Sequence, residues 1–164
     1  MVVDDSSVIR QMICDFVSEA PDMEVVGVAP NGATAVELYD TIQPDVVTLD
    51  IQMPGMDGLA VLEALMAKRP VVVIMVSALT QVGAAITLDA LDRGALDYVA
   101  KPESRAETEA VLRDELLRKI RTMAGADVKR ILEIRAKRAE RRQQRDPGRR
   151  PPMPPIEVTA LADK

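Results

Sequence analysis

The chain has 164 residues, enough for one domain and a shorter additional segment. Its 48% hydrophobic and 29% charged residues are ordinary for a globular protein, so wholesale disorder, collagen and a long coiled coil are poor interpretations. Histidine is absent and Cys14 is the single cysteine, which excludes Ser-His-Asp hydrolases, zincins and an internal disulfide. No apolar run is long enough to span a bilayer and no signal peptide is recognisable, so we expect a soluble, cytoplasmic protein without membrane insertion.

Charge is unevenly distributed along the chain. Residues 1–104 contain 5 Lys or Arg and 16 Asp or Glu, whereas residues 105–164 contain 16 Lys or Arg and 10 Asp or Glu. The sequence therefore has an acidic body and a basic tail.

Short β-branched runs alternate with segments of helical period over the first hundred residues. This alternation predicts an α/β fold of flavodoxin-like topology: a doubly wound, five-stranded parallel sheet of order 2-1-3-4-5 with helices on both faces. In chain order, the expected elements are strand 1–4, a helix capped by Ser6 or Ser7 and stopped by Pro21, strand 24–29, helix 33–42, strand 46–49, helix 58–68, strand 71–76, helix 81–93, strand 96–100 and helix 104–123.

The composition changes after Met123. A helix is expected from Val128 to about Gln144, and residues 147–155 contain five of the eleven prolines, as in an extended linker. We therefore expect a domain at residues 1–123, a basic helical and then proline-rich linker at 124–155, and a tail or stump of a missing domain at 156–164.

Charged and hydroxyl side chains follow four of the expected strands. Adjacent parallel strands lie about 4.8 Å apart, so carboxylates at the ends of neighbouring strands should crowd into one pocket. A hard divalent cation resolves their repulsion, and oxygen ligands favour Mg²⁺, which in turn attracts phosphate. A lysine and a hydroxyl complete a candidate phosphoryl-transfer site. Its residues are Asp4, Asp5, Asp50, Ser77 and Lys101.

Each of these residues has a simpler explanation when it is taken alone. Asp4 and Asp5 could cap the following helix, Asp50 could be a loop acid, and Lys101 with Pro102 could form a solvated turn. Their joint occurrence at the strand ends of one sheet favours the phosphoryl-transfer interpretation.

The same residues resemble a known family. Val3-Asp4-Asp5-Ser6, Asp50 with the Met-Pro-Gly-Met-Asp-Gly run at 53–58, Ser77-Ala78 and Lys101-Pro102 resemble the receiver domain of two-component response regulators over about residues 1–123. Segments 44–50, 76–80 and 83–91 look more narrowly like the regulatory half of the chemotaxis protein-glutamate methylesterase.

This resemblance implies a phosphorylation site, a Mg²⁺ site and a switch. The implied roles are Asp50 as phospho-acceptor; Asp4, Asp5, Asp50 and the backbone carbonyl of Gln52 as metal ligands; Lys101 as a contact to the phosphoryl group; Ser77 as switch hydroxyl; Tyr98 as switch aromatic; and Pro102 as the residue after a cis peptide bond.

The resemblance also implies partners. A histidine kinase would donate the phosphoryl group, and a methylesterase domain or another effector would bind the face made by the fourth helix, fifth strand and fifth helix, with chemoreceptors as further partners. The chain lacks the Gly-x-Ser-x-Gly turn and histidine of the esterase, so the only enzyme activities we expect are self-phosphorylation from a donor and autodephosphorylation.

Two other functions remain open. The chain could be a stand-alone regulator whose basic tail binds another protein or nucleic acid, although no aromatic residues are interleaved for base stacking, which makes nucleic acid a poor partner. It could also be an aspartyl hydrolase, but such enzymes need a second acid where this chain has Gln52. The first strand is three residues long before Asp4, shorter than in the family, which indicates a truncated strand or a misassigned start.

Overall fold

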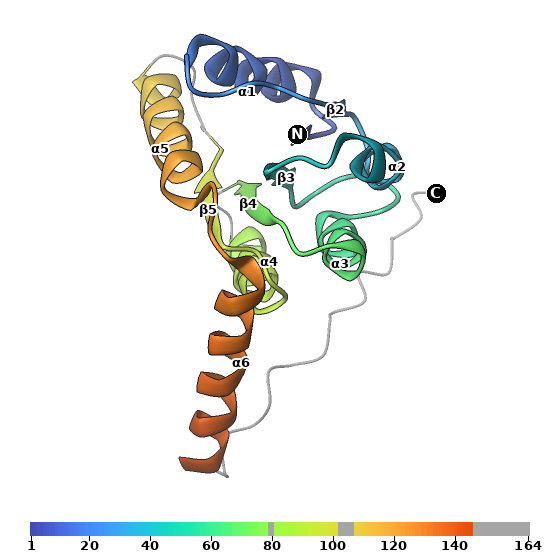
Figure 1. Ribbon diagram of the computed structural model, residues 1–164. Coiled ribbons are helices and arrows are strands. Elements are labelled where there is room, and N and C mark those ends of the chain that lie inside the picture. The colour runs from blue at the N-terminus through green and yellow to red at the C-terminus, as the bar shows by residue number, and fades with distance from the viewer. Residues whose placement is uncertain (79–80, 102–106, 146–164) are drawn as a thin grey trace, which may run out of the picture. The chain divides into compact units, whose positions relative to one another are not determined.

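Five parallel strands form one sheet in the order β2-β1-β3-β4-β5 (Figure 1). The computed structural model describes residues 1–78, 81–101 and 107–145. The strands are β1 (Val2–Val3), β2 (Val28–Ala29), β3 (Val46–Asp50), β4 (Val72–Ser77) and β5 (Asp97–Ala100), and the helices are α1 (Ser7–Glu19), α2 (Gly32–Ile42), α3 (Gly58–Lys68), α4 (Gln81–Asp92), α5 (Glu107–Met123) and α6 (Val128–Arg145). The predicted doubly wound topology is confirmed.

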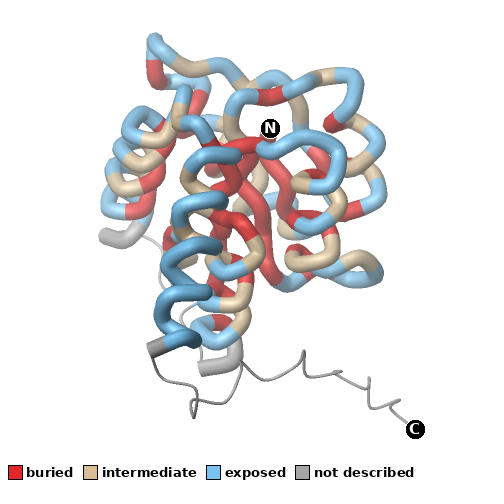
Figure 2. The backbone as a smooth tube through the Cα atoms, turned by 60° about the horizontal axis from the view of Figure 1, so that its bottom comes forward, coloured by how far each residue is buried: buried red, intermediate tan, exposed pale blue. Residues whose placement is uncertain are grey.

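The sheet is covered on both faces because its central strands are apolar on both sides. All six residues of β4 are buried, and so are four of the five residues of β3. Helix α1 packs against α5 at one face, whereas α2 packs against α3 and α3 against α4 at the other. Figure 2 shows the strands as the buried centre, with the helices turning exposed residues outward.

Side-chain caps begin three of the helices where the sequence changes from strand to helix. The Ser6 Oγ accepts from the Ile9 amide at 3.3 Å, the Asn31 Oδ1 from the Thr34 amide at 2.8 Å, and the Asp57 Oδ1 from the Ala60 amide at 2.9 Å. These caps fix the places where the loops after β1, β2 and β3 end.

Strand β2 is shorter than expected. The sequence predicted a strand over residues 24–29, but only Val28 and Ala29 are paired, because β1 offers just Val2 and Val3 as ladder partners. The Val2 amide makes one further bond to the Gly27 carbonyl at 2.9 Å. The prediction of a long second strand was therefore wrong, and that of a short first strand is confirmed.

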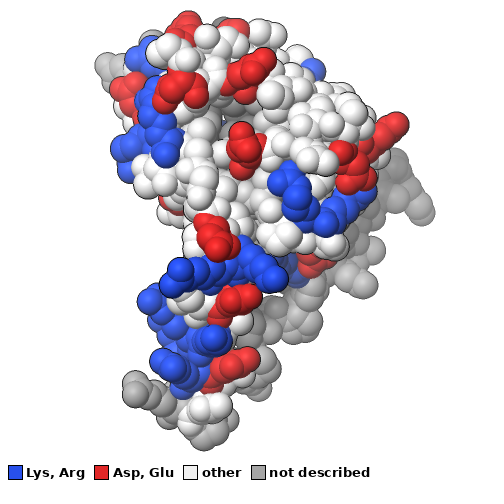
Figure 3. Space-filling model, viewed as in Figure 1, with Lys and Arg blue, Asp and Glu red and all other residues white. Residues whose placement is uncertain are grey.

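The chain divides into two units, residues 1–129 and residues 130–164. Most of α6 belongs to the second unit, and its sequence contains eight Lys or Arg and two Glu residues. Figure 3 shows basic side chains gathered along α6 and acidic ones scattered over the first unit.

The start predicted for the fifth helix at residue 104 and the proline-rich segment 147–155 lie outside the described residues. Of the helices that the structure describes, none has the length and apolar character needed to cross a bilayer.

Candidate functional site

Three carboxylates meet at the carboxyl ends of β1 and β3. Asp4 and Asp5 follow β1, and Asp50 is the last residue of β3. Because β1 and β3 are neighbours, one carboxylate oxygen from each residue lies within 4.8 Å of the others. Asp4 and Asp50 are buried, with 0% and 2% of their surfaces exposed, whereas Asp5 is exposed. The structure thus brings together the acids that the sequence predicted would converge.

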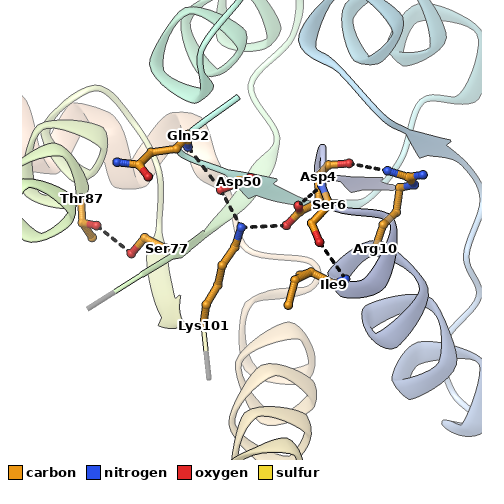
Figure 4. A network of polar contacts seen from close by, with 9 residues as sticks. All are labelled: Asp4, Ser6, Ile9, Arg10, Asp50, Gln52, Ser77, Thr87 and Lys101. Carbon is orange, nitrogen blue, oxygen red and sulfur yellow. Dashed lines mark hydrogen bonds and ion pairs between the residues drawn. The ribbon is translucent and has the colours of Figure 1, made fainter. Parts of the chain in front are cut away.

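The Lys101 ammonium lies between the two buried carboxylates (Figure 4). Its Nζ is 3.0 Å from the Asp50 Oδ1 and 3.2 Å from the Asp4 Oδ2. The Lys101 amide also donates to the Ser77 carbonyl at 2.7 Å, which continues the pairing of β5 with β4 and sets the origin of the lysine side chain. The sequence analysis placed Lys101 at the same site as these acids, and its pair with Asp4 was not anticipated.

The electrostatics of the site are dominated by Asp50. Burial, followed by the neighbouring Asp4 charge, raises the pKa of Asp50 from 3.8 to about 7, although Lys101 opposes both effects. One ammonium therefore does not fully offset the burial of two carboxylates, and the site favours additional positive charge.

Two carboxylate oxygens are held by backbone amides and two are not. The Asp4 Oδ1 accepts from the Ser6 amide at 2.9 Å, and the Asp50 Oδ1 accepts from the Gln52 amide at 3.2 Å. Among the described residues, none donates a hydrogen bond to the buried Oδ2 of either carboxylate, and the Asp4 Oδ2 has only its ion pair with Lys101. Buried carboxylate oxygens without hydrogen bonds, beside a third carboxylate, are a donor set that fits a hard cation.

The capping alternative for the acid pair does not hold. Ser6, and neither Asp4 nor Asp5, supplies the N-cap of α1. Asp4 instead bonds the amide of Ser6, two residues on, which shapes the loop after β1. The Arg10 Nη1 donates to the Asp4 carbonyl at 2.8 Å and ties α1 to the same loop. The sequence analysis did not single out Arg10, because one basic residue in a partly apolar helix is no specific signal.

A cavity of about 230 Å³ opens beside these carboxylates. Its polar lining includes Asp5, Asp50, Gln52, Ser77 and Lys101. Gln52 thus lies at the site, although its carbonyl as a metal ligand stays a prediction. Ser77, the last residue of β4, is 6% exposed and makes its side-chain hydrogen bond to Thr87 of α4, a residue that the sequence analysis did not single out.

Tyr98, another expected switch residue, is not among the residues that line this cavity. Tyr98 of β5 is 42% exposed, and its ring centroid is 5.2 Å from the Lys119 Nζ. The same Lys119 Nζ donates to the Tyr98 carbonyl at 2.6 Å. Pro102, and with it the expected cis peptide bond, lies outside the described residues.

Gly58 packs directly against the main chain of Asp50. It is the first residue of α3, and its amide donates to the Ile51 carbonyl at 2.9 Å. A Cβ atom on Gly58 would lie 2.3 Å from the Asp50 carbonyl oxygen and 2.7 Å from the Ile51 Cα, closer than real Cβ contacts allow. The last glycine of the 53–58 run is therefore required by close packing of one backbone on another.

Comparison with known proteins identifies the family of this chain. The family model described as the response regulator receiver domain matches residues 1–113. The chain belongs to this family. The acids at the ends of β1 and β3 and the lysine after β5 all lie in the matched part of this receiver domain.

Curated relatives point to a particular kind of receiver. The chain is 47% identical over 133 residues to the protein-glutamate methylesterase/protein-glutamine glutaminase of Nitrosomonas europaea, which covers 80% of this chain and 37% of that protein. It is 44% identical over 145 residues to the protein of the same name from Pyrococcus abyssi, covering 88% of this chain and 39% of that protein. The chain therefore spans less than two fifths of the length of these relatives.

Solved structures also resemble this chain in sequence and in fold. The response regulator domain of Thermotoga maritima CheB is 46% identical and superposes with a TM-score of 0.70, covering 77% of this chain and 95% of that one. The CheX-CheY-BeF3-Mg+2 complex from Borrelia burgdorferi contains a chain that is 29% identical, with a TM-score of 0.62 and coverage of 74% and 85%. The receiver domain described above is thus similar to those of the CheB chemotaxis proteins.

Proposed function

We propose that this receiver accepts a phosphoryl group on Asp50 from the phosphohistidine of a histidine kinase and uses it to control an effector. The observation that carries the proposal is the state of the Asp50 carboxylate. One of its oxygens is fixed by the Gln52 amide and the Lys101 ammonium, and the other is buried without a hydrogen bond. The carboxylate also borders a cavity with room for an incoming group.

Mg²⁺ is the metal that we propose for the site, held by Asp4, Asp5, Asp50 and the backbone carbonyl of Gln52. The Borrelia burgdorferi complex is named for Mg²⁺ together with a beryllium fluoride, and the clustered carboxylates of this chain suit the same ion. When bound, the ion supplies positive charge that offsets the carboxylates and the incoming phosphate together.

Lys101 and Ser77 act on the phosphoryl group once it is attached. The Lys101 ammonium already contacts Asp50, so a phosphoryl group there gains a charge-assisted contact without a large movement of the lysine. Ser77 borders the same cavity from β4 and offers a hydroxyl donor. Movement of Ser77 would free space for Tyr98, which changes the face made by α4, β5 and α5.

The effector that we propose is a methylesterase domain of the kind named in the relatives, with residues 124–155 as the connecting segment. It would bind the α4–β5–α5 face in one phosphorylation state and leave it in the other. A difference of a few kcal/mol in binding between the two states is enough for such a switch. Chemoreceptors are the further partners that this function entails.

Phosphorylation by acetyl phosphate tests the proposal. The intact chain should gain the mass of one phosphoryl group when Mg²⁺ is present, and Asp50→Asn should gain none, because an amide cannot form the acyl phosphate. Asp45→Asn removes an exposed acid from the other end of β3 and should be labelled like the wild type. Label that survives in Asp50→Asn, or that forms equally well with a chelator, would show that the assignment is wrong.

Asp5→Asn should weaken Mg²⁺ binding about tenfold or more while changing the stability of the metal-free protein by less than about 0.5 kcal/mol. Asp5 is exposed and does not cap α1, so the fold does not depend on its charge, whereas the ion loses a carboxylate ligand. Magnesium titration by calorimetry and thermal melts measure the two quantities. Glu19→Gln, an exposed acid at the end of α1, serves as the control. Unchanged magnesium affinity in Asp5→Asn would count against the metal site.

A further inference from the structure

A buried chain of hydroxyl groups leads from β4 into α4. The Ser77 Oγ lies 3.0 Å from the Thr87 Oγ1, and the Thr87 Oγ1 donates to the Gly83 carbonyl at 2.7 Å (Figure 4 shows the first pair). Ser77 and Thr87 are only 6% and 4% exposed, so the hydrogen bonds between them and to the described backbone lie largely out of contact with bulk water.

The direction of this chain follows from the number of protons. A hydroxyl has one proton to donate, and a carbonyl oxygen can only accept. Thr87 donates its proton to the Gly83 carbonyl, so in the Ser77–Thr87 pair it must be the acceptor and Ser77 the donor. The Ser77 proton is therefore directed toward α4.

That direction conflicts with the role that a phosphorylated Asp50 would require of Ser77. Phosphoryl oxygens are acceptors, and the single Ser77 proton cannot serve Thr87 and a phosphoryl group at once. The Ser77 backbone cannot follow easily, because the Lys101 amide holds its carbonyl at 2.7 Å. The hydroxyl must therefore leave Thr87 when it turns toward the cavity.

We propose that Thr87 is a positioning residue that holds the Ser77 proton away from Asp50 in the unphosphorylated protein and so sets how readily phosphorylation moves the switch hydroxyl. This inference rests on the proposed function. Release leaves Thr87 well satisfied, because it keeps its own bond to the Gly83 carbonyl and loses only a donor to its oxygen. The threshold of the switch then depends on one hydrogen bond between β4 and α4.

Two variants of the full chain separate this role from packing. Thr87→Val keeps the branched shape and removes the acceptor, whereas Thr87→Ser keeps the hydroxyl and removes a methyl group. With Mg²⁺ present, Thr87→Val should bind beryllofluoride about fivefold more tightly than the wild type, the equivalent of one ordinary hydrogen bond lost from the free state. Thr87→Ser should match the wild type. Fluorine magnetic resonance of bound beryllofluoride measures both affinities.

A packing role alone would give the opposite order, with Thr87→Val unchanged and Thr87→Ser altered, and would overturn the inference. In a Ser77→Ala background, Thr87→Val should have no effect on affinity, and an undiminished fivefold effect would also overturn it. Failure of the wild type to bind beryllofluoride, or equal binding by Asp50→Asn, would overturn the proposed function and this inference with it. Normal binding that is insensitive to Thr87→Val would overturn the inference alone.

Discussion

Replacing Gly58 by alanine is expected to lower the free energy of unfolding by about 3 kcal/mol, the upper part of the range for overpacking a closely packed site. The added methyl group would meet the Asp50 carbonyl oxygen at 2.3 Å and the Ile51 Cα at 2.7 Å. Both contacts are main-chain atoms, so no flexible side chain can move aside. Relief requires α3 or the end of β3 to shift, and Asp50 shifts with it. Urea unfolding of the metal-free chain measures the loss.

Gly55→Ala is the matched control for this substitution. Gly55 lies in the loop three residues before Gly58 and has a φ of +77°. Beyond its chain neighbours, no atom of the described residues lies within 4 Å of the position that an added methyl group would take. Its replacement costs only the left-handed backbone conformation, about 1 kcal/mol. Gly58→Ala should also slow the phosphorylation of Asp50. In Gly55→Ala the rate of phosphorylation should stay closer to that of the wild type. Equal losses of stability in the two variants would contradict the role assigned to close packing.

Replacing Asp50 by asparagine is expected to stabilise the metal-free protein at neutral pH. The pKa of Asp50 is raised from 3.8 to about 7 by burial and by the Asp4 charge, so the folded state binds this proton more tightly than the unfolded state does. Between these two pH values the folded protein therefore holds the extra proton, and its stability falls as the pH rises. The penalty from this carboxylate is complete above about pH 7.

The difference in unfolding free energy between Asp50→Asn and the wild type should accordingly grow as the pH is raised from 3.8 to about 7 and then level off. Asparagine carries no charge to bury, and Lys101 keeps its pair with Asp4 in the variant. Urea titrations at several pH values, with a chelator present, give the difference. Asp45→Asn should show no comparable growth. A difference that shrinks with rising pH would mean that the Asp50 pKa is lowered in the folded protein.

The pattern of apolar residues predicted the fold because each element is stabilised by local signals that agree with its burial. The run at β4 is buried on every residue, and the cap at Ser6 begins α1 where the apolar period starts. The extent of β2 could not be predicted in this way. Strand length depends on a partner elsewhere in the sequence, and Val2 and Val3 of β1 are the only residues that pair with it among those the structure describes.

The sequence predicted the site residues that lie at the ends of strands, but it did not predict the roles of Thr87 and Gly58. Asp4 and Lys101 are each the first residue after a strand, and Asp50 is the last residue of one, and parallel topology brings such ends together. Thr87 gave no such signal, because a threonine within an apolar helix is as consistent with packing as with a hydrogen bond. Gly58 was noticed as part of a motif, but its closeness to the Asp50 carbonyl is a property of tertiary packing.

Because aromatic residues are rare in this chain, the exposed position of Tyr98 has a consequence for its fluorescence. The chain has no tryptophan and two tyrosines, of which Tyr39 is buried with its hydroxyl bonded to the Arg69 carbonyl at 2.7 Å. Tyr98 is exposed beside the Lys119 ammonium, on the face proposed to respond to phosphorylation. The ultraviolet emission of the unlabelled protein therefore comes from one core ring and one surface ring, and the surface ring is a built-in optical reporter of that face.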